Sequence, residues 1–262
     1  MNSADTSPAL KLMLADFILN LESANDVSSS FDILAKASEQ LGFQGLVYTS
    51  IATGLEPLTT SGPLFFRSDG FSEAFLTHYQ QADFASQDFT IKRIMNDDLG
   101  LMNWWQEEQK GRLTDYERQV IDVARHEYSI ENGLSIPLLK NDHQIAGCSV
   151  VSQDKGVVFG LLLEERLTTL KVMLRLFHDR SYANIDFQKQ LYLPLLKQLN
   201  PTERTVLRFL ASGLPLKSIE AVSGISPSYA GNVRTVLFRK LGVKNVSELA
   251  YIVGLHRILD LI

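Results

Sequence analysis

Hydrophobic residues recur at helical spacing along residues 10–21 and again along residues 31–41, which predicts two amphipathic helices near the start of the chain. Glycines interrupt this pattern within residues 42–45. Residues 46–51 are then rich in β-forming side chains and predict a strand. A loop rich in Gly, Pro, Thr and Ser follows up to Pro63. The chain is therefore expected to begin with two helices and one strand.

Short helices and short strands are expected to alternate through the middle of the chain. The predicted helices cover residues 71–79, 90–95 and 164–178, with another beginning at the capping box of Thr114 and Glu117, and a predicted hairpin pairs residues 134–138 with 145–151 around a turn at 140–142. A small sheet with helices on its faces can enclose a ligand between the two layers. This order predicts an α+β fold, in the form of an α/β/α sandwich.

Helix caps and turns are clearest from residue 199 onwards. Asn200 supplies an N-cap, Pro201 the first helical position and Glu203 the partner residue of a capping box. The expected helices cover residues 201–213, 216–222 and 227–241, with a last one beginning at Asn245. Two short helices joined by a tight turn at Gly224 have the geometry of a helix-turn-helix, whose second helix enters the DNA major groove. The pattern predicts an all-α four-helix unit of this kind, with an unrelated helical hairpin as the alternative.

Charge is distributed unevenly along the chain. The whole chain has 25 Lys and Arg against 30 Asp and Glu. Residues 195–262 contain 9 basic and 4 acidic residues, net +5, so the rest contains 16 and 26, net −10. A basic module attached to an acidic body is typical of a DNA-binding unit joined to a part that does not touch DNA. We therefore predict a small-molecule-binding domain at residues 1–178, a linker at 179–194 and a helix-turn-helix domain at 195–262.

Several classes of protein are disfavoured by motifs that the sequence lacks. Cys148 has no cysteine partner, which excludes an internal disulfide framework. The apolar runs are far shorter than the roughly 20 residues of a membrane helix, so we expect a soluble, cytoplasmic protein without membrane contact. The sequence has no H-E-x-x-H, G-x-S-x-G, P-loop or G-x-G-x-x-G motif. The strand at residues 46–51 is not followed by the acidic residues of a phosphorylated receiver domain. We expect no enzyme activity, no catalytic residues, no metal and no cofactor.

The last quarter of the chain resembles the DNA-binding domain of the LuxR family. The matching segments are Leu199–Arg204, Val206–Leu207, Ala211–Gly213, Lys217–Ile219, Gly224–Ser226 and Arg239–Asn245. The resemblance implies that the recognition helix contacts DNA from its N-terminal half. The candidates for this contact are Ser228, Tyr229, Asn232, Arg234 and Thr235.

Basic residues of the same module are expected to meet phosphates, which set affinity more than specificity. They are Lys217, Arg234, Arg239, Lys240 and Lys244, and the alternative for each is a solvated charge on a helix. Gly231 and Thr235 stand where relatives often have a basic residue. This departure weakens guanine readout and favours adenine readout by Asn232.

The first 180 or so residues resemble the autoinducer-binding domain that many LuxR regulators carry. The matching pattern consists of Phe75 and Tyr79, Asp88, Trp104 or Trp105, and Gly133 with Ser135 and Pro137. The resemblance implies a pocket for an acylated lactone, with Asp88 accepting the amide N–H and Tyr79 and Ser149 bonding the amide carbonyl. One tryptophan would cover the lactone ring, and Gly133 would let a strand approach closely. Counting from Gly133 favours Trp105, whereas counting from Asp88 favours Trp104.

Phe75 departs from the family pattern, in which a tryptophan donates its indole N–H to the lactone carbonyl. Phenylalanine cannot donate, and leaving that carbonyl unpaired costs on the order of 1–3 kcal/mol, so either another donor substitutes or the ligand differs. Phe89 also replaces the proline that usually follows the aspartate. The simpler alternatives are that Phe71, Phe75 and Tyr79 only pack in the core, and that Asp88 only caps a helix.

These patterns together predict a ligand-responsive transcription regulator of the LuxR quorum-sensing type. We expect it to sense an N-acyl-homoserine lactone or a similar small signal, and to bind double-stranded DNA as a homodimer. The alternative is a solo regulator of the same type that binds a non-lactone ligand or acts without a ligand.

Overall fold

The computed structural model describes residues 7–54, 62–154 and 156–262. Contacts within the chain divide it into two compact units. Among the described residues, the larger unit consists of residues 7–50, 63–141, 145–154 and 156–184, and the smaller unit consists of residues 51–54, 62, 142–144 and 185–262. The two units are built differently, one around a sheet and one from helices.

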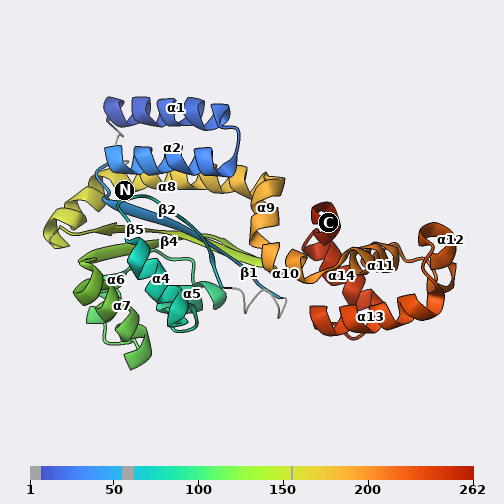
Figure 1. The fold of residues 1–262 in the computed structure, drawn as a ribbon. Helices are drawn as coiled ribbons and strands as arrows, with labels where there is room; N and C mark the ends of the chain where they lie inside the picture. The colour runs from blue at the N-terminus through green and yellow to red at the C-terminus, as the bar shows by residue number, and fades with distance from the viewer. Residues whose placement is uncertain (1–6, 55–61, 155) are drawn as a thin grey trace. The chain divides into compact units, whose positions relative to one another are not determined.

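A five-stranded sheet forms the centre of the larger unit (Figure 1). Its strands are β1 (Gly45–Ala52), β2 (Leu64–Arg67), β3 (Met102–Asn103), β4 (Asn132–Lys140) and β5 (Gln144–Ser152), in the spatial order β2-β1-β5-β4-β3. The pairs β1–β2, β3–β4 and β4–β5 are antiparallel. Because Asn103 pairs with Leu134, the residue that follows it, Trp104, is held beside β4.

Helices cover both faces of this sheet (Figure 1). On one face lie α1 (Pro8–Ser23), α2 (Val27–Gln40) and α8 (Gly156–Ala183), and on the other lie α4 (Glu73–Gln81), α5 (Phe89–Met95), α6 (Trp104–Gln109) and α7 (Asp115–Tyr128), with a 3-10 turn at Phe84–Ser86. Apolar side chains of both layers are buried against the strands. The predicted α+β class is therefore confirmed, with its sheet between two helical layers.

A buried pair fastens α8 to β1. The Tyr48 hydroxyl lies 2.8 Å from His178 Nδ1, and both side chains are buried. The Tyr48 and Phe177 rings pack edge to face with centroids 5.1 Å apart. Burial lowers the pKa of His178 to about 4, so its imidazole is neutral near pH 7 and pairs with the hydroxyl as an uncharged group.

Most of these elements lie where the sequence pattern places them. The capping box is present: Thr114 N–H donates to Glu117 Oε2 at 2.9 Å, and Glu117 N–H donates to Thr114 Oγ1 at 3.3 Å. The β4–β5 hairpin is also present. The helix expected over residues 164–178 is longer, because the preceding apolar run continues it back to Gly156. The loop predicted up to Pro63 lies for the most part outside the described residues.

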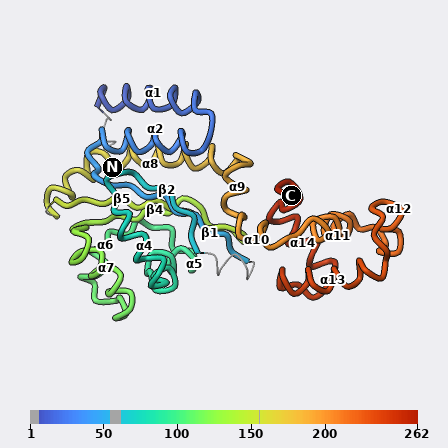
Figure 2. Tube along the Cα trace, in the orientation of Figure 1, coloured from blue at the N-terminus to red at the C-terminus, as the bar shows by residue number. Residues whose placement is uncertain are grey.

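The smaller unit is helical in its C-terminal part. Its elements are α9 (Ile185–Leu191), α10 (Leu193–Gln198), α11 (Pro201–Ala211), the 3-10 turn Leu216–Ser218, α12 (Ile219–Ser223), α13 (Pro227–Leu241), α14 (Val246–Leu255) and α15 (Ile258–Leu261). Helix α11 packs on α13 and α14 (Figure 2). Residues 179–194, expected as a linker, are mostly helical, since α8 continues to Ala183 and α9 follows it.

Two caps define the turn between α12 and α13. Gly224 closes α12 with a φ of 70°, which lies in the left-handed region that favours glycine. Ser226 then caps α13 by accepting a hydrogen bond from Tyr229 N–H, and Pro227 occupies the first helical turn. The predicted short helix, glycine turn and second helix are therefore all present.

Candidate ligand and DNA sites

An aromatic cluster on the sheet face covered by α4–α7 contains several of the predicted ligand-binding residues. Phe75 and Tyr79 project from α4 into this buried cluster, and Trp104 packs against it. The Phe75 ring centroid lies 5.9 Å from that of Tyr79 and 5.4 Å from that of Tyr128. Phe75 and Tyr79 therefore pack in the core, as the simpler alternative expected, and the cluster is one group of buried apolar side chains.

Asp88 connects this cluster to α5. Its Oδ1 accepts hydrogen bonds from Thr90 N–H and Thr90 Oγ1, each at 2.7 Å, so it caps the helix. Its Oδ2 accepts a hydrogen bond from the Tyr79 hydroxyl at 2.8 Å. Burial, together with the nearby Asp88 charge, raises the pKa of Tyr79 well above its usual value. Tyr79 therefore remains a protonated donor, and Asp88 both caps α5 and orients Tyr79.

Trp104 faces the cluster. A Cβ atom on Gly133 would lie only 2.3 Å from Trp104 Cδ2, so the indole ring lies directly on the glycine backbone. Trp104 Nε1 donates to Ser135 Oγ at 2.9 Å, and the Ser135 and Ser149 hydroxyls are 2.8 Å apart. Ser135 and Ser149 are partners in the β4–β5 register, which explains why residues distant in sequence meet here.

Trp105 lies apart from these contacts. Its Nε1 donates to the Glu131 carbonyl oxygen, and the Arg125 guanidinium lies over its ring. Trp105 therefore lies away from the other predicted ligand-binding residues. Trp104, the tryptophan favoured by counting from Asp88, is the one that faces the cluster. The predicted residues that the structure connects are Phe75, Tyr79, Asp88, Trp104, Gly133, Ser135 and Ser149.

Two contributors were not predicted from the sequence. Thr90 gives Asp88 two hydrogen bonds. The Tyr128 ring packs against that of Phe75 in a tilted arrangement, and its hydroxyl lies 3.0 Å from His78 Nδ1. Thr90 could have been found from the helix-cap pattern that begins at Asp88. Tyr128 has no local signal, because it reaches the cluster only through the packing of α7 on α4.

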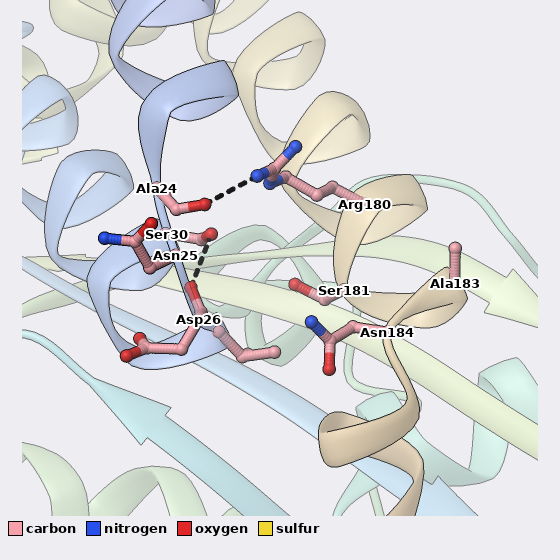
Figure 3. Close-up of a pocket in the computed structure, with 9 residues that line it drawn as sticks. Ala24, Asn25, Asp26, Ser30, Arg180, Ser181, Ala183 and Asn184 are labelled. Carbon is pink, nitrogen blue, oxygen red and sulfur yellow. Dashed lines mark hydrogen bonds between the residues drawn. The ribbon is translucent and has the colours of Figure 1, made fainter.

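A surface hollow lies elsewhere in the same unit, between the α1–α2 connection and the end of α8 (Figure 3). Arg180 Nη2 donates to the Ala24 carbonyl oxygen at 2.7 Å, and Ser30 Oγ donates to the Asp26 carbonyl oxygen at 2.8 Å. The first bond holds the end of α1 against α8, and the second lies within the first turn of α2. None of the predicted ligand-binding residues lines this hollow.

Exposed residues of α13 form one stripe along the helix. Ser228, Asn232, Thr235 and Arg239 are exposed and follow one another at spacings of four, three and four residues, which places them on one helix face. The buried residues Ala230, Val233, Leu237 and Leu241 form the opposite face. Tyr229 is exposed beside the stripe, and Lys217 is exposed on the 3-10 turn before α12.

Two predicted DNA contacts have other partners in this unit. Lys240 Nζ lies 2.7 Å from Glu203 Oε1, a carboxylate whose side chain is only 6% exposed, and also donates to the Gln198 carbonyl oxygen. The Arg234 guanidinium lies 6.0 Å from the centroid of the Phe238 ring. The structure therefore uses Lys240 to neutralise a buried carboxylate, whereas Arg239 on the stripe is exposed to solvent.

Two other properties of residues 7–54, 62–154 and 156–262 concern membranes and metal ions. No helix in these ranges is long and apolar enough to cross a membrane. No group of three or more His, Cys, Asp or Glu side chains in them could hold a metal ion.

The sequence matches the family model of the autoinducer binding domain over residues 26–181, which is more than half of the chain. The chain belongs to the autoinducer-binding domain family. The match begins at the N-cap of α2 and ends in α8. The sheet, the aromatic cluster and the polar pairs around it therefore all lie within the autoinducer-binding domain.

Solved structures resemble this chain at low sequence identity. CepR2 from Burkholderia cenocepacia, an N-acylhomoserine lactone dependent LuxR family transcription factor, is 15% identical, with 67% of this chain and 99% of that chain covered and a TM-score of 0.51. SdiA of Escherichia coli is 14% identical over 95% of this chain and 98% of its own, with a TM-score of 0.49. At this identity the likeness to CepR2 shows a shared fold alone. No curated protein matches the chain.

Proposed function

We propose that the chain is a ligand-responsive transcription regulator of the LuxR quorum-sensing type. Its autoinducer-binding domain holds an N-acyl-homoserine lactone or a similar small signal, and its C-terminal helices bind double-stranded DNA. The observation that carries this proposal is the family membership of residues 26–181. The chemistry of the residues gathered in that domain supports it.

An acylated signal needs an apolar surface and a few oriented polar groups. The aromatic cluster provides the first, and two hydrogen-bonded sets beside it provide the second: Tyr79 with Asp88, and Trp104 with Ser135 and Ser149. The Asp88 carboxylate accepts the amide N–H of the signal. The Ser149 hydroxyl, or the Tyr79 hydroxyl once it has released Asp88, donates to its amide carbonyl.

Phe75 favours a second candidate, a signal without a lactone ring. Its buried side chain contacts the rings of Phe71, Tyr79 and Tyr128 and has no hydrogen-bond donor. A lactone carbonyl left unpaired here would cost on the order of 1–3 kcal/mol, or roughly ten- to a hundredfold in affinity. A signal whose end is apolar avoids that cost, and a regulator that acts without a signal is the remaining alternative.

The C-terminal helices supply the features of a DNA-binding module. Residues 195–262 have a net charge of +5, and α12 and α13 are joined by the glycine turn of a helix-turn-helix. Two such modules in a homodimer would meet two half-sites of an operator. Occupancy of the first domain would then shift the population of the DNA-competent arrangement, and the protein would act in the cytoplasm, where its DNA lies.

Thermal unfolding of the whole protein with N-acyl-homoserine lactones of several acyl lengths tests the first half of this proposal. A ligand at a hundred times its dissociation constant stabilises the folded state by about 2.7 kcal/mol. We expect a clear upward shift for at least one length and its loss in Asp88→Ala. Asp26→Ala is the matched control, because it also removes a helix N-cap but lies outside the cluster.

The outcomes separate the candidates. A shift that survives in Asp88→Ala would contradict the assigned role of this carboxylate. An absence of shift with every lactone, in protein that unfolds cooperatively, would exclude the lactone. In that case a shift with apolar-ended amides would support the second candidate.

A further inference from the structure

We propose that α13 reads a half-site with A·T base pairs at its centre. In this assignment Asn232 bonds an adenine, Thr235 contacts a thymine methyl group, and Gly231 lets the helix approach the base edges closely. The inference rests on the DNA binding proposed above, and it names the bases to which that binding is directed.

The exposed stripe of α13 has no positive charge along its first turns. Ser228, Asn232 and Thr235 come first, and Arg239 follows only at the C-terminal end, about 16 Å from Ser228 at 1.5 Å per residue. Recognition helices contact bases mainly from their N-terminal residues. Since guanine is read chiefly by Arg or Lys, the uncharged part of this stripe favours A·T pairs.

Asn232 has the chemistry that adenine requires. Its amide offers a donor and an acceptor side by side, which match the N7 acceptor and N6 donor that adenine presents in the major groove. The side chain is exposed near the middle of the stripe. It therefore occupies the position from which a bidentate contact to one base is made.

Thr235 has its hydroxyl turned toward the helix. Thr235 Oγ1 donates to the Gly231 carbonyl oxygen at 3.2 Å, and this bond restricts the side chain to one rotamer. The methyl branch is then the part of the side chain that is left to meet a ligand. A methyl group in the major groove packs against the C5-methyl of thymine.

Gly231 has no packing role in the described structure. A Cβ atom at this position would meet nothing within 4 Å, although glycine destabilises a helix interior relative to alanine. It lies three residues after Ser228 and four before Thr235, at the border of the stripe. The bare backbone there lets the helix approach the base edges more closely than any side chain would allow.

Selection of binding sites from random DNA duplexes by the whole protein, at fixed salt, tests the base assignment. We expect A·T pairs at adjacent central positions. Replacing the selected adenine pair by G·C should weaken wild-type binding about tenfold and leave the binding of Asn232→Ala almost unchanged. Selection of G·C at these positions would overturn this inference and leave the proposed function standing. If no duplex is bound in a salt-dependent way, with or without the lactone panel, the proposed function fails and this inference fails with it.

A matched pair of glycine variants tests the close approach. Gly254 of α14 is also a helical glycine whose added Cβ would meet nothing within 4 Å. We expect Gly231→Ala and Gly254→Ala to raise the melting temperature by similar amounts. Only Gly231→Ala should weaken binding to the selected duplex, by about tenfold. Equal DNA affinity of the two variants would show that the helix does not approach the bases at Gly231.

Discussion

The two units have one structural feature in common but differ in how they place their candidate functional residues. Each has a buried Tyr–His pair, Tyr48 with His178 at 2.8 Å and Tyr192 with His256 at 2.9 Å. In the autoinducer-binding domain, however, the candidate site is built from residues of different helices and strands that hydrogen-bond to one another. In the C-terminal unit, four of the candidate contacts, Ser228, Asn232, Thr235 and Arg239, lie on one exposed helix face.

This difference determines what a substitution does. In the first unit a site residue is also part of the fold, so that Asp88 caps a helix while it orients Tyr79. On the α13 stripe a residue can change without disturbing the packing of the opposite face. Ligand binding and stability should therefore change together in the first unit and separately in the second.

The largest expected effect on stability comes from the buried histidine that each unit contains. Burial lowers the pKa of His178 and of His256 to about 4 each, below the usual 6.5 or so of an unfolded chain. Between these values the unfolded state binds more protons, so stability falls as the pH drops from about 6.5 to about 4. The loss should be on the order of 3 kcal/mol for each histidine.

Urea unfolding from pH 7 to pH 4 measures this effect. His178→Gln and His256→Gln should each flatten the pH dependence of unfolding for their own unit, because glutamine does not titrate. A pH dependence that is unchanged in both variants would contradict the buried, neutral state of these imidazoles.

A smaller effect is expected from the glycine under Trp104. Gly133→Ala places a methyl group where the indole ring lies, so we expect a loss of about 1–3 kcal/mol in the unfolding free energy of the first unit. Tryptophan fluorescence should report the displaced ring. Gly160→Ala in α8 is the control, since its Cβ would meet nothing within 4 Å. If both variants unfolded alike, the ring would not lie on Gly133.

The smallest effect on stability, together with a distinct effect on binding, is expected from Arg239, in contrast to its ion-paired neighbour Lys240. Lys240→Met leaves the buried Glu203 without its ion pair and should destabilise the C-terminal unit by about 1–3 kcal/mol. Arg239→Ala should change stability by less than about 0.5 kcal/mol but reduce the salt dependence of DNA binding by about one phosphate contact. Chemical unfolding and a salt titration of DNA affinity measure the two effects. A large stability loss from Arg239→Ala and a small one from Lys240→Met would contradict the placement of both residues.

Sequence patterns predicted the elements whose signals are local. The capping boxes at Thr114 and Asn200 are both present, because a cap is made within four residues of the chain. The strands β2 and β3 were not predicted, since runs of four and two residues are too short to show an alternation. Their pairing depends on neighbouring strands that are distant in sequence.

The candidate ligand site could be predicted only in part for the same reason. Asp88 and Tyr79 are close in the chain, and both their contact and the N-cap role of Asp88 follow from the fold of one segment. The choice between Trp104 and Trp105 depended on how β3 registers against β4, which spacing along the chain does not fix. The ion pair of Lys240 with the buried Glu203 likewise depends on the packing of α13 on α11.

The central claim is that the two units are coupled, so that a signal in the first changes DNA binding by the second. The most direct test is the affinity of the whole protein for a selected duplex, at fixed salt, with and without a saturating signal that has given a thermal shift. We predict a change of about tenfold, within the range usual for coupled sites. If the protein binds both the signal and the duplex, and its affinity for the duplex is the same with and without the signal, the account of a ligand-responsive regulator is contradicted.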